Sequence, residues 1–126
     1  MTEKDYNIQS ETKFPQLEVI DVPSIVSSTK EKWINYALNN VNDDVVRLAI
    51  IEGEFHWHKH EDEDEFFFVL EGKLFIEVEE DGAKKMLELN PMQGVTIPKG
   101  VVHCPRAPQK TVVLLFEKGT TKLTGN

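Results

Sequence analysis

Hydrophobic and polar residues alternate with a period of two over most of the chain from Asp44 onward. Side chains of a β-strand point to opposite faces in turn, so this alternation predicts strands. Turn residues separate the runs, and Asp81-Gly82 is a dipeptide typical of tight hairpins. The predicted strand segments are VVRLAIIE, EFHWHKH, EFFFVLEG, KLFIEVEE, KMLELN, GVTIP and TVVLLFEK. Their spacing predicts an all-β, antiparallel sandwich or small barrel.

The residues before this region follow a different pattern. Residues 1–14 are polar and predict an arm that is mobile or packs on a sheet edge. Residues 17–22 alternate like a strand, which Pro23 ends. Ser28 and Glu31 fit a capping box before the segment KEKWINYALNN, where one helical face would carry Trp33, Ile34, Ala37 and Leu38. We therefore expect one short helix in this segment and no other.

Two of the predicted strands, residues 66–70 and 112–116, are apolar on both faces. One face of each strand can line the interior, but the other face needs cover too. We expect the N-terminal helix to cover part of that outer face. A second subunit would cover the rest, which predicts a homodimer.

Length and composition limit the possible classes of protein. The 126 residues predict one domain, with the arm, strand and helix in 1–43, the barrel in 44–118 and a tail in 119–126. A net charge of -8 disfavours nucleic acid and anionic lipid surfaces as partners. No apolar run is long enough to cross a membrane. The first ten residues lack a signal-peptide pattern, and the single Cys104 cannot form an internal disulfide, so we expect a cytoplasmic protein.

The densest chemistry lies in the segment EFHWHKHEDEDEFFFVLEG, residues 54–72. On a strand, His58 and His60 point to the same side, so their imidazoles can converge on one point. Glu65 follows after enough residues for a turn, and it shares a strand face with the apolar Phe67. A carboxylate on an interior face is costly unless it is paired or bound to a cation. The acids between His60 and Glu65 predict a solvated hairpin turn.

The fourth histidine, His103, follows a predicted tight turn at Pro98 and Gly100. Three imidazoles and one carboxylate suit divalent iron, manganese, nickel, zinc or copper, and contain too much nitrogen for magnesium or calcium. We therefore predict a divalent transition-metal cofactor held by His58, His60, Glu65 and His103. Cys104, the next residue, points away from such a site on a strand and is expected to be a small buried residue.

These residues carry a resemblance to the cupins. The first cupin motif, G-x5-H-x-H-x3,4-E-x6-G, is matched with its first spacer one residue short by Gly53, His58, His60, Glu65 and Gly72. The second motif, G-x5-P-x-G-x2-H-x3-N, is matched by Pro98, Gly100 and His103. Met92 and Ala107 stand at its first glycine and its asparagine, so Gly94 is expected to supply the flexibility of that loop. The chain resembles small one-domain cupins of unassigned function, sometimes labelled mannose-6-phosphate isomerase-like.

The resemblance implies a double-stranded β-helix, a jelly-roll-like barrel with the metal in one mouth, and dimers formed through outer sheet faces. The function it leaves open is a metal-dependent enzyme acting on a small molecule, with oxygenase favoured and isomerase-like chemistry as the alternative. A binding or sensing module that captures a small ligand without turnover is the second hypothesis. His56 lies on the same strand face; a barrel-lining role is favoured for it, and catalytic acid/base work is the tentative alternative.

Overall fold

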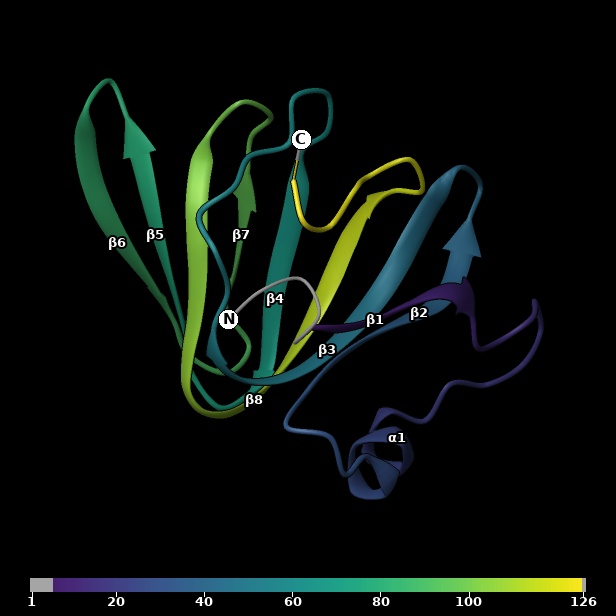
Figure 1. Cartoon of the computed structure of the whole chain (residues 1–126). Coiled ribbons are helices and arrows are strands. Elements are labelled where there is room, and N and C mark those ends of the chain that lie inside the picture. The colour runs from purple at the N-terminus through teal and green to yellow at the C-terminus, as the bar shows by residue number, and fades with distance from the viewer. Residues whose placement is uncertain (1–5, 126) are drawn as a thin grey trace.

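The computed structural model describes residues 6–125, which form a strongly curved β-structure with one short helix on its outer side (Figure 1). Its elements in chain order are β1 (Asn7–Thr12), α1 (Val22–Ser28), β2 (Trp33–Val41), β3 (Asp44–Glu54), β4 (Glu65–Glu71), β5 (Leu74–Glu80), β6 (Ala83–Leu89), β7 (Gly94–Ile97) and β8 (Val102–Lys118). The expected all-β class is confirmed.

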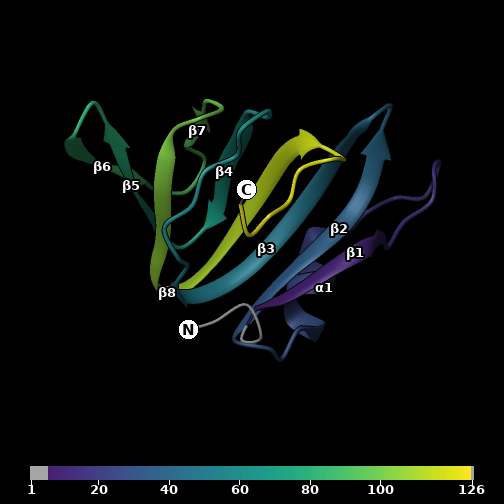
Figure 2. The same ribbon diagram turned by 45° about the horizontal axis from the view of Figure 1, so that its top comes forward.

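Strand β8 bends and takes part in both halves of the fold. Its residues 102–106 pair with β5, residues 111–118 pair with β3, and residues 112–116 also pair with β4. One half has the strand order β1-β2-β3-β8-β4-β7, and β5 and β6 form the other half with the first part of β8. Figure 2 shows the two halves meeting at this bend, so that their inner faces are the two walls of a flattened barrel, the double-stranded β-helix.

The inner faces carry the main core. In β4, Glu65, Phe67 and Val69 are buried, whereas Phe66 between them is 38% exposed. The same alternation in β5 buries Leu74, Ile76 and Val78. Each fully buried aliphatic or aromatic side chain contributes roughly 1.5–3 kcal/mol relative to exposure, so these inward rows fix the register of the strands.

The hairpin between β5 and β6 has the predicted turn. Glu80 pairs with Ala83, and the two residues between them, Asp81 and Gly82, have φ angles of 50° and 79°. Two successive positive φ angles define a type I′ turn, whose twist matches that of the flanking strands. The Asp-Gly prediction is therefore confirmed.

The predicted helix within KEKWINYALNN is wrong. Residues 33–41 form β2, which pairs antiparallel with β3 and parallel with β1. Ile34 and Leu38 pack outward with α1, while Trp33 and Asn35 face the interior. Because both faces of β2 are covered, apolar residues occur on both, and their spacing imitates one face of a helix.

The helix lies earlier, where a strand was predicted. Val22 begins α1 and Pro23 occupies its first turn, a position where proline's missing N–H costs nothing. Residues 17–21 form no strand, and Leu17 has a φ angle of 68°. Of the predicted arm, residues 7–12 form the edge strand β1, and residues 1–5 lie outside the described part.

Helix α1 covers part of the outer face of the larger half, beneath β2 in Figure 1. Its Ile25 is buried against a second apolar cluster that includes Leu48, Ile50 and Val112. The segment before β2 therefore supplies the expected outer cover, although its secondary structure differs from the prediction. Within residues 6–125, no helix is long and apolar enough to cross a membrane.

Candidate metal centre

The four predicted ligands come together from three parts of the chain. His58 and His60 lie on the extended segment after β3, Glu65 begins β4, and His103 lies near the start of β8. The segment EFHWHKH is not a continuous strand as predicted. Instead, the backbones of His58 and His103 form an isolated bridge, with N–H to carbonyl distances of 3.0 and 2.8 Å.

The ligand atoms converge tightly. One ligand atom from each of His58, His60, Glu65 and His103 lies within 4.8 Å of the other three. Glu65 Oε1 is 3.4 Å from His60 Nε2 and 3.4 Å from His103 Nε2. Two ligands bound about 2.1 Å from one tetrahedral metal ion stand about 3.4 Å apart, so the spacing fits coordination.

Backbone carbonyls fix the orientation of two of the rings. His58 Nδ1 lies 2.9 Å from the carbonyl of His56, and His103 Nδ1 lies 2.9 Å from that of Val101. A carbonyl can only accept, so each Nδ1 carries the hydrogen and each Nε2 keeps a lone pair in the neutral ring. This arrangement of a donating outer nitrogen and a free inner nitrogen is the usual support for a metal-bound histidine.

Buried polar atoms without partners point to the same conclusion. Among the described residues, His60 Nε2, His103 Nε2 and Glu65 Oε1 are buried and make no hydrogen bond. Buried polar atoms are nearly always satisfied, and these three face one another. A divalent cation between them would satisfy all three.

The pKa values at the site also favour a cation. Burial, with a smaller contribution from His103, lowers the pKa of His58 to about 3, so this ring is a neutral base at ordinary pH. Burial tends to raise the pKa of Glu65, but contacts with His103 and His60 outweigh it and hold that pKa well below its usual range. A buried carboxyl group that stays ionised needs a positive charge beside it.

A tight turn just before β8 positions His103. Val101 N–H donates to the Pro98 carbonyl at 3.2 Å, and Gly100 has a φ angle of 83°, which gives the predicted tight turn. Gly100 N–H also donates to the His60 carbonyl at 2.7 Å and so joins the turn to the other ligand segment. Met92, at the motif's glycine position, has a φ angle of 69°. Met92 itself therefore adopts the left-handed conformation, and Gly94, which was expected to supply the flexibility of this loop, does not.

His56 lies beside the cluster and outside the group of ligand atoms. Its Nε2 is 2.7 Å from the Thr124 carbonyl, and its ring stacks on Phe55 with centroids 4.3 Å apart. Its tentative acid/base role stays a prediction. The acids of the turn between His60 and Glu65 are mostly exposed, as expected, and Asp64 accepts a hydrogen bond from Lys99 N–H at 2.9 Å. Cys104 is buried, also as expected.

A second buried cluster was not predicted. Arg47 Nε lies 3.2 Å from Glu117 Oε1, and both side chains are at most 10% exposed. Burial, reinforced by the charge of Glu65, raises the pKa of Glu117 to about 10, so Glu117 keeps its proton at neutral pH. The alternation of strand faces could have revealed this cluster, because Arg47 shares a face with the apolar Ala49 just as Glu65 shares one with Phe67.

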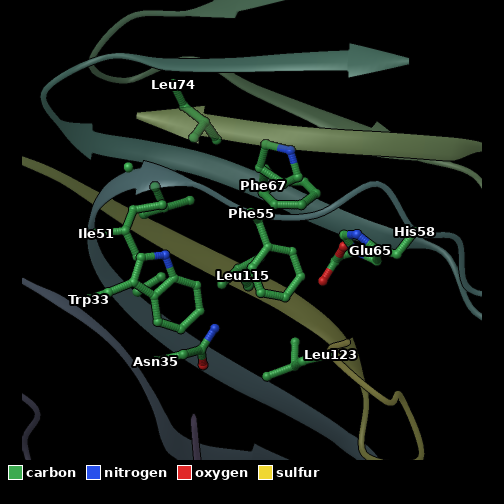
Figure 3. Close-up of a pocket in the computed structure, with 14 residues that line it drawn as sticks. Trp33, Asn35, Ile51, Phe55, His58, Glu65, Phe67, Leu74, Leu115 and Leu123 are labelled. Atoms are coloured by element: carbon green, nitrogen blue, oxygen red, sulfur yellow. The ribbon is translucent and has the colours of Figure 1, made fainter. Parts of the chain in front are cut away.

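A cavity of about 50 Å³ adjoins the ligands between the two halves of the barrel (Figure 3). His58 and Glu65 form one end of it. The remaining walls are almost entirely apolar and consist of Trp33, Asn35, Ala49, Ile51, Gly53, Phe55, Phe67, Leu74, Pro105, Val113, Leu115 and Leu123. Two of the candidate ligands therefore face a mainly apolar space that can hold a small molecule.

This is a β-barrel in which three histidines and one glutamate form a candidate metal site. The chain belongs to the cupin domain family, whose model matches residues 44–117. This match confirms the resemblance found in the sequence motifs.

Similar proteins include one from Bacillus subtilis and several of known structure. The uncharacterized protein YdbB of Bacillus subtilis strain 168 is 43% identical over 94 residues, which cover 75% of this chain and 80% of that protein. A cupin-2 domain containing protein from Shewanella frigidimarina is 33% identical, with a TM-score of 0.72 over 79% of this chain and 94% of the other. Protein NMB1881 from Neisseria meningitidis is 25% identical, with a TM-score of 0.67 over 80% and 99%.

Proposed function

We propose that this cupin holds a divalent transition metal between His58, His60, Glu65 and His103 and acts as an oxygenase on a small molecule in the adjoining cavity. The observation that supports this most is the convergence of buried, unpartnered ligand atoms at the wall of that cavity. A bound iron, manganese or copper ion would supply redox and Lewis-acid chemistry there.

The residues around the centre have separate tasks in this proposal. The carbonyls of His56 and Val101 hold the His58 and His103 rings with Nε2 inward. Glu65 supplies the negative charge that raises affinity for a divalent ion over a monovalent one. The aromatic walls exclude water, which strengthens electrostatic interactions inside and protects reactive species from hydrolysis.

The lining of the cavity favours oxygen chemistry over sugar isomerisation. Besides the two ligands, the described lining residues offer only the Asn35 amide and the Trp33 indole N–H as polar side-chain groups. A sugar isomerase needs several polar groups for the hydroxyls of its substrate and a base that moves a proton. His56 does not line the cavity, and its Nε2 is engaged with Thr124.

Elemental analysis of protein purified without added metal tests the centre. We expect about one divalent metal ion per chain in the wild type and in His56→Ala, and almost none in His103→Ala. His56→Ala is the matched control because it removes a neighbouring histidine outside the ligand group. Equal metal loss in both variants, or a wild type that neither carries nor takes up metal, would refute the assignment.

Metal identity and oxygen uptake separate the oxygenase from its alternative, a non-catalytic binding or sensing module. Redox-active metal with oxygen consumption on catechol-like or dicarbonyl compounds supports the oxygenase. The small size of the cavity favours the alternative, because it suits capture of a compact ligand. Zinc as the sole native metal, with no turnover of any tested compound, would support binding.

We also propose that the chain forms a homodimer through the outer face that α1 leaves open. Phe66 and Phe116 are paired in adjacent strands and are 38% and 41% exposed. Exposed paired aromatics on a sheet face are typical of an interface. Light scattering at micromolar concentration should give a dimer for the wild type and for Val41→Asp, and a monomer for Phe66→Asp/Phe116→Asp. A monomeric wild type would contradict the proposal.

A further inference from the structure

The C-terminal strap, residues 119–125, returns from the end of β8 across the opening between the two halves of the barrel (Figures 1 and 2). Two side chains hold it there. Thr120 Oγ1 donates to Glu63 Oε2 at 3.2 Å, and His56 Nε2 donates to the Thr124 carbonyl at 2.7 Å. The strap is thus fastened at both ends to the segment that carries the metal ligands.

The end of the strap packs directly on one ligand. A Cβ atom at Gly125, whose φ angle is 94°, would lie 2.7 Å from His58 Cβ and 3.0 Å from the Lys59 carbonyl. Real Cβ atoms almost never approach so closely, so this contact requires glycine. The strap therefore covers the ligand segment at van der Waals distance.

Leu123 of the strap forms part of the cavity wall, on the side of Asn35 (Figure 3). With Leu123 in place the cavity measures about 50 Å³. Sites for drug-sized ligands usually measure several hundred Å³, whereas about 10–15 Å³ of this kind of space holds one water molecule. The closed site therefore suits a compact molecule, and Leu123 limits its size.

Asn35 gives the cavity an amide group on the wall away from the two ligands. Asn35 Oδ1 accepts a hydrogen bond from Arg47 Nη1 at 3.2 Å, so the oxygen is turned toward the Arg47 side. In Figure 3 the amide nitrogen lies on the cavity side of the group. Among the described residues no acceptor is recorded for this nitrogen. An amide N–H on an apolar wall selects a ligand that carries an acceptor oxygen, and rejects one with many hydroxyls.

We propose, building on the metal centre above, that the cavity takes a small, mainly hydrocarbon molecule with one acceptor oxygen, and that Leu123 and Asn35 determine this specificity. Leu123 sets the size limit, and Asn35 Nδ2 binds the oxygen. His56 positions Leu123 because it fastens the strap.

Methyl NMR with three cyclic probes tests both determinants. Cyclopentanone should shift the methyl signals of Ile51, Leu74 and Leu115 in the zinc-loaded wild type, and cyclo-octanone should bind at least tenfold more weakly. Leu123→Ala should restore most of the lost affinity for cyclo-octanone. His56→Phe should restore part of it, because it keeps a ring on Phe55 but loses the hydrogen bond to the Thr124 carbonyl. Leu17→Ala, at a fully exposed leucine, is the matched control and should bind as the wild type does.

Asn35→Asp tests the oxygen contact, because it keeps an acceptor for Arg47 but removes the amide donor. It should weaken cyclopentanone binding about tenfold, which is the loss of affinity expected when one hydrogen bond is removed. Binding of cyclopentane, which has no oxygen, should stay within threefold of wild type. The methyl NMR spectrum of each variant without ligand shows whether it is folded.

Repeating the titrations after chelation separates this inference from the metal centre. One outcome is that the chain binds no zinc while the metal-free protein still prefers the smaller ring and the ring with an oxygen. That result would uphold the inference and refute the metal centre. A zinc-loaded wild type that binds no cyclic probe, or that binds the larger ring equally well, would overturn the inference alone. So would a Leu123→Ala variant with wild-type selectivity.

Discussion

Two buried polar clusters lie inside the same barrel, and they are satisfied in different ways. In the first, three imidazoles and the Glu65 carboxylate face one another, and no cationic side chain is among these four residues. In the second, Arg47 brings its own positive charge to Glu117 and donates to Asn35 and to the Gln9 carbonyl, at 3.2 and 3.0 Å. The second cluster contains its own cation, whereas the first lacks one.

This difference separates a structural cluster from a candidate binding site. A buried charge is tolerated when its partner is part of the protein, and the pair then needs nothing from outside. The first cluster holds the charge of Glu65 with no cationic side chain among its four members, so an external cation would balance it. Glu117 links the two clusters, because it lies beside Arg47 and the charge of Glu65 helps to raise its pKa.

The largest expected effect tests whether the first cluster depends on metal. At free zinc about a thousand times above its Kd, metal binding should raise the free energy of unfolding by about 4 kcal/mol. His103→Ala should lose this gain, while His56→Ala should keep it. Urea denaturation with zinc and with chelator measures the difference. An equal gain in His103→Ala would show that zinc acts elsewhere.

The next effect tests whether the second cluster is self-sufficient. Arg47→Met should lower the free energy of unfolding by about 3 kcal/mol, because Glu117 and Asn35 lose a buried partner. Arg47→Met/Glu117→Leu should recover most of that loss, since it removes both members of the pair. Urea denaturation of the two variants decides this. A double variant as unstable as the single one would mean that packing, and not charge, accounts for the loss.

A smaller effect tests the link through Glu117 in metal-free protein. Its pKa is raised from 4.5 to about 10, so between these values the folded chain keeps a proton that the unfolded chain releases. Stability should therefore fall as pH rises, by at most about 1.4 kcal/mol per pH unit. Glu117→Gln cannot ionise and should flatten this slope.

The stabilities of wild type and Glu117→Gln should be compared above pH 6.5. Below that pH, the titration of His58 changes stability in the opposite direction. The lowered pKa of His58 means that the unfolded chain binds a proton first, so stability falls as pH drops from 6.5 toward about 3. Urea denaturation near pH 7 and pH 8, for wild type and Glu117→Gln, measures the slope. Parallel slopes in the two proteins would show that Glu117 ionises normally.

The barrel strands and the metal ligands could be predicted because each leaves a short-range signal. Period-two alternation marks a strand, and His58 with His60 shares a face through local geometry alone. The N-terminal third gave no such signal. Trp33 and Leu38 lie on opposite faces of β2, and each face is covered by residues of other elements, α1 on the outside and later strands on the inside. Local spacing cannot distinguish that burial from a helix.

The Arg47 cluster and the strap depend on long-range contacts. Arg47 and Glu117 are 70 positions apart in the sequence and meet because β3 pairs with β8. Thr124 meets His56 through a backbone carbonyl, which every residue has. Neither contact involves a residue type or spacing that marks it in advance, so both required the fold.

The continuity of β8 has a consequence for hydrogen exchange. This 17-residue strand carries His103 near one end and Glu117 near the other, and its residues 112–116 are paired on both sides. Amide hydrogens in such a central strand exchange only when a large part of the protein opens. An ion bound at His103 should therefore slow exchange along the whole strand, as far as the amides beside Glu117.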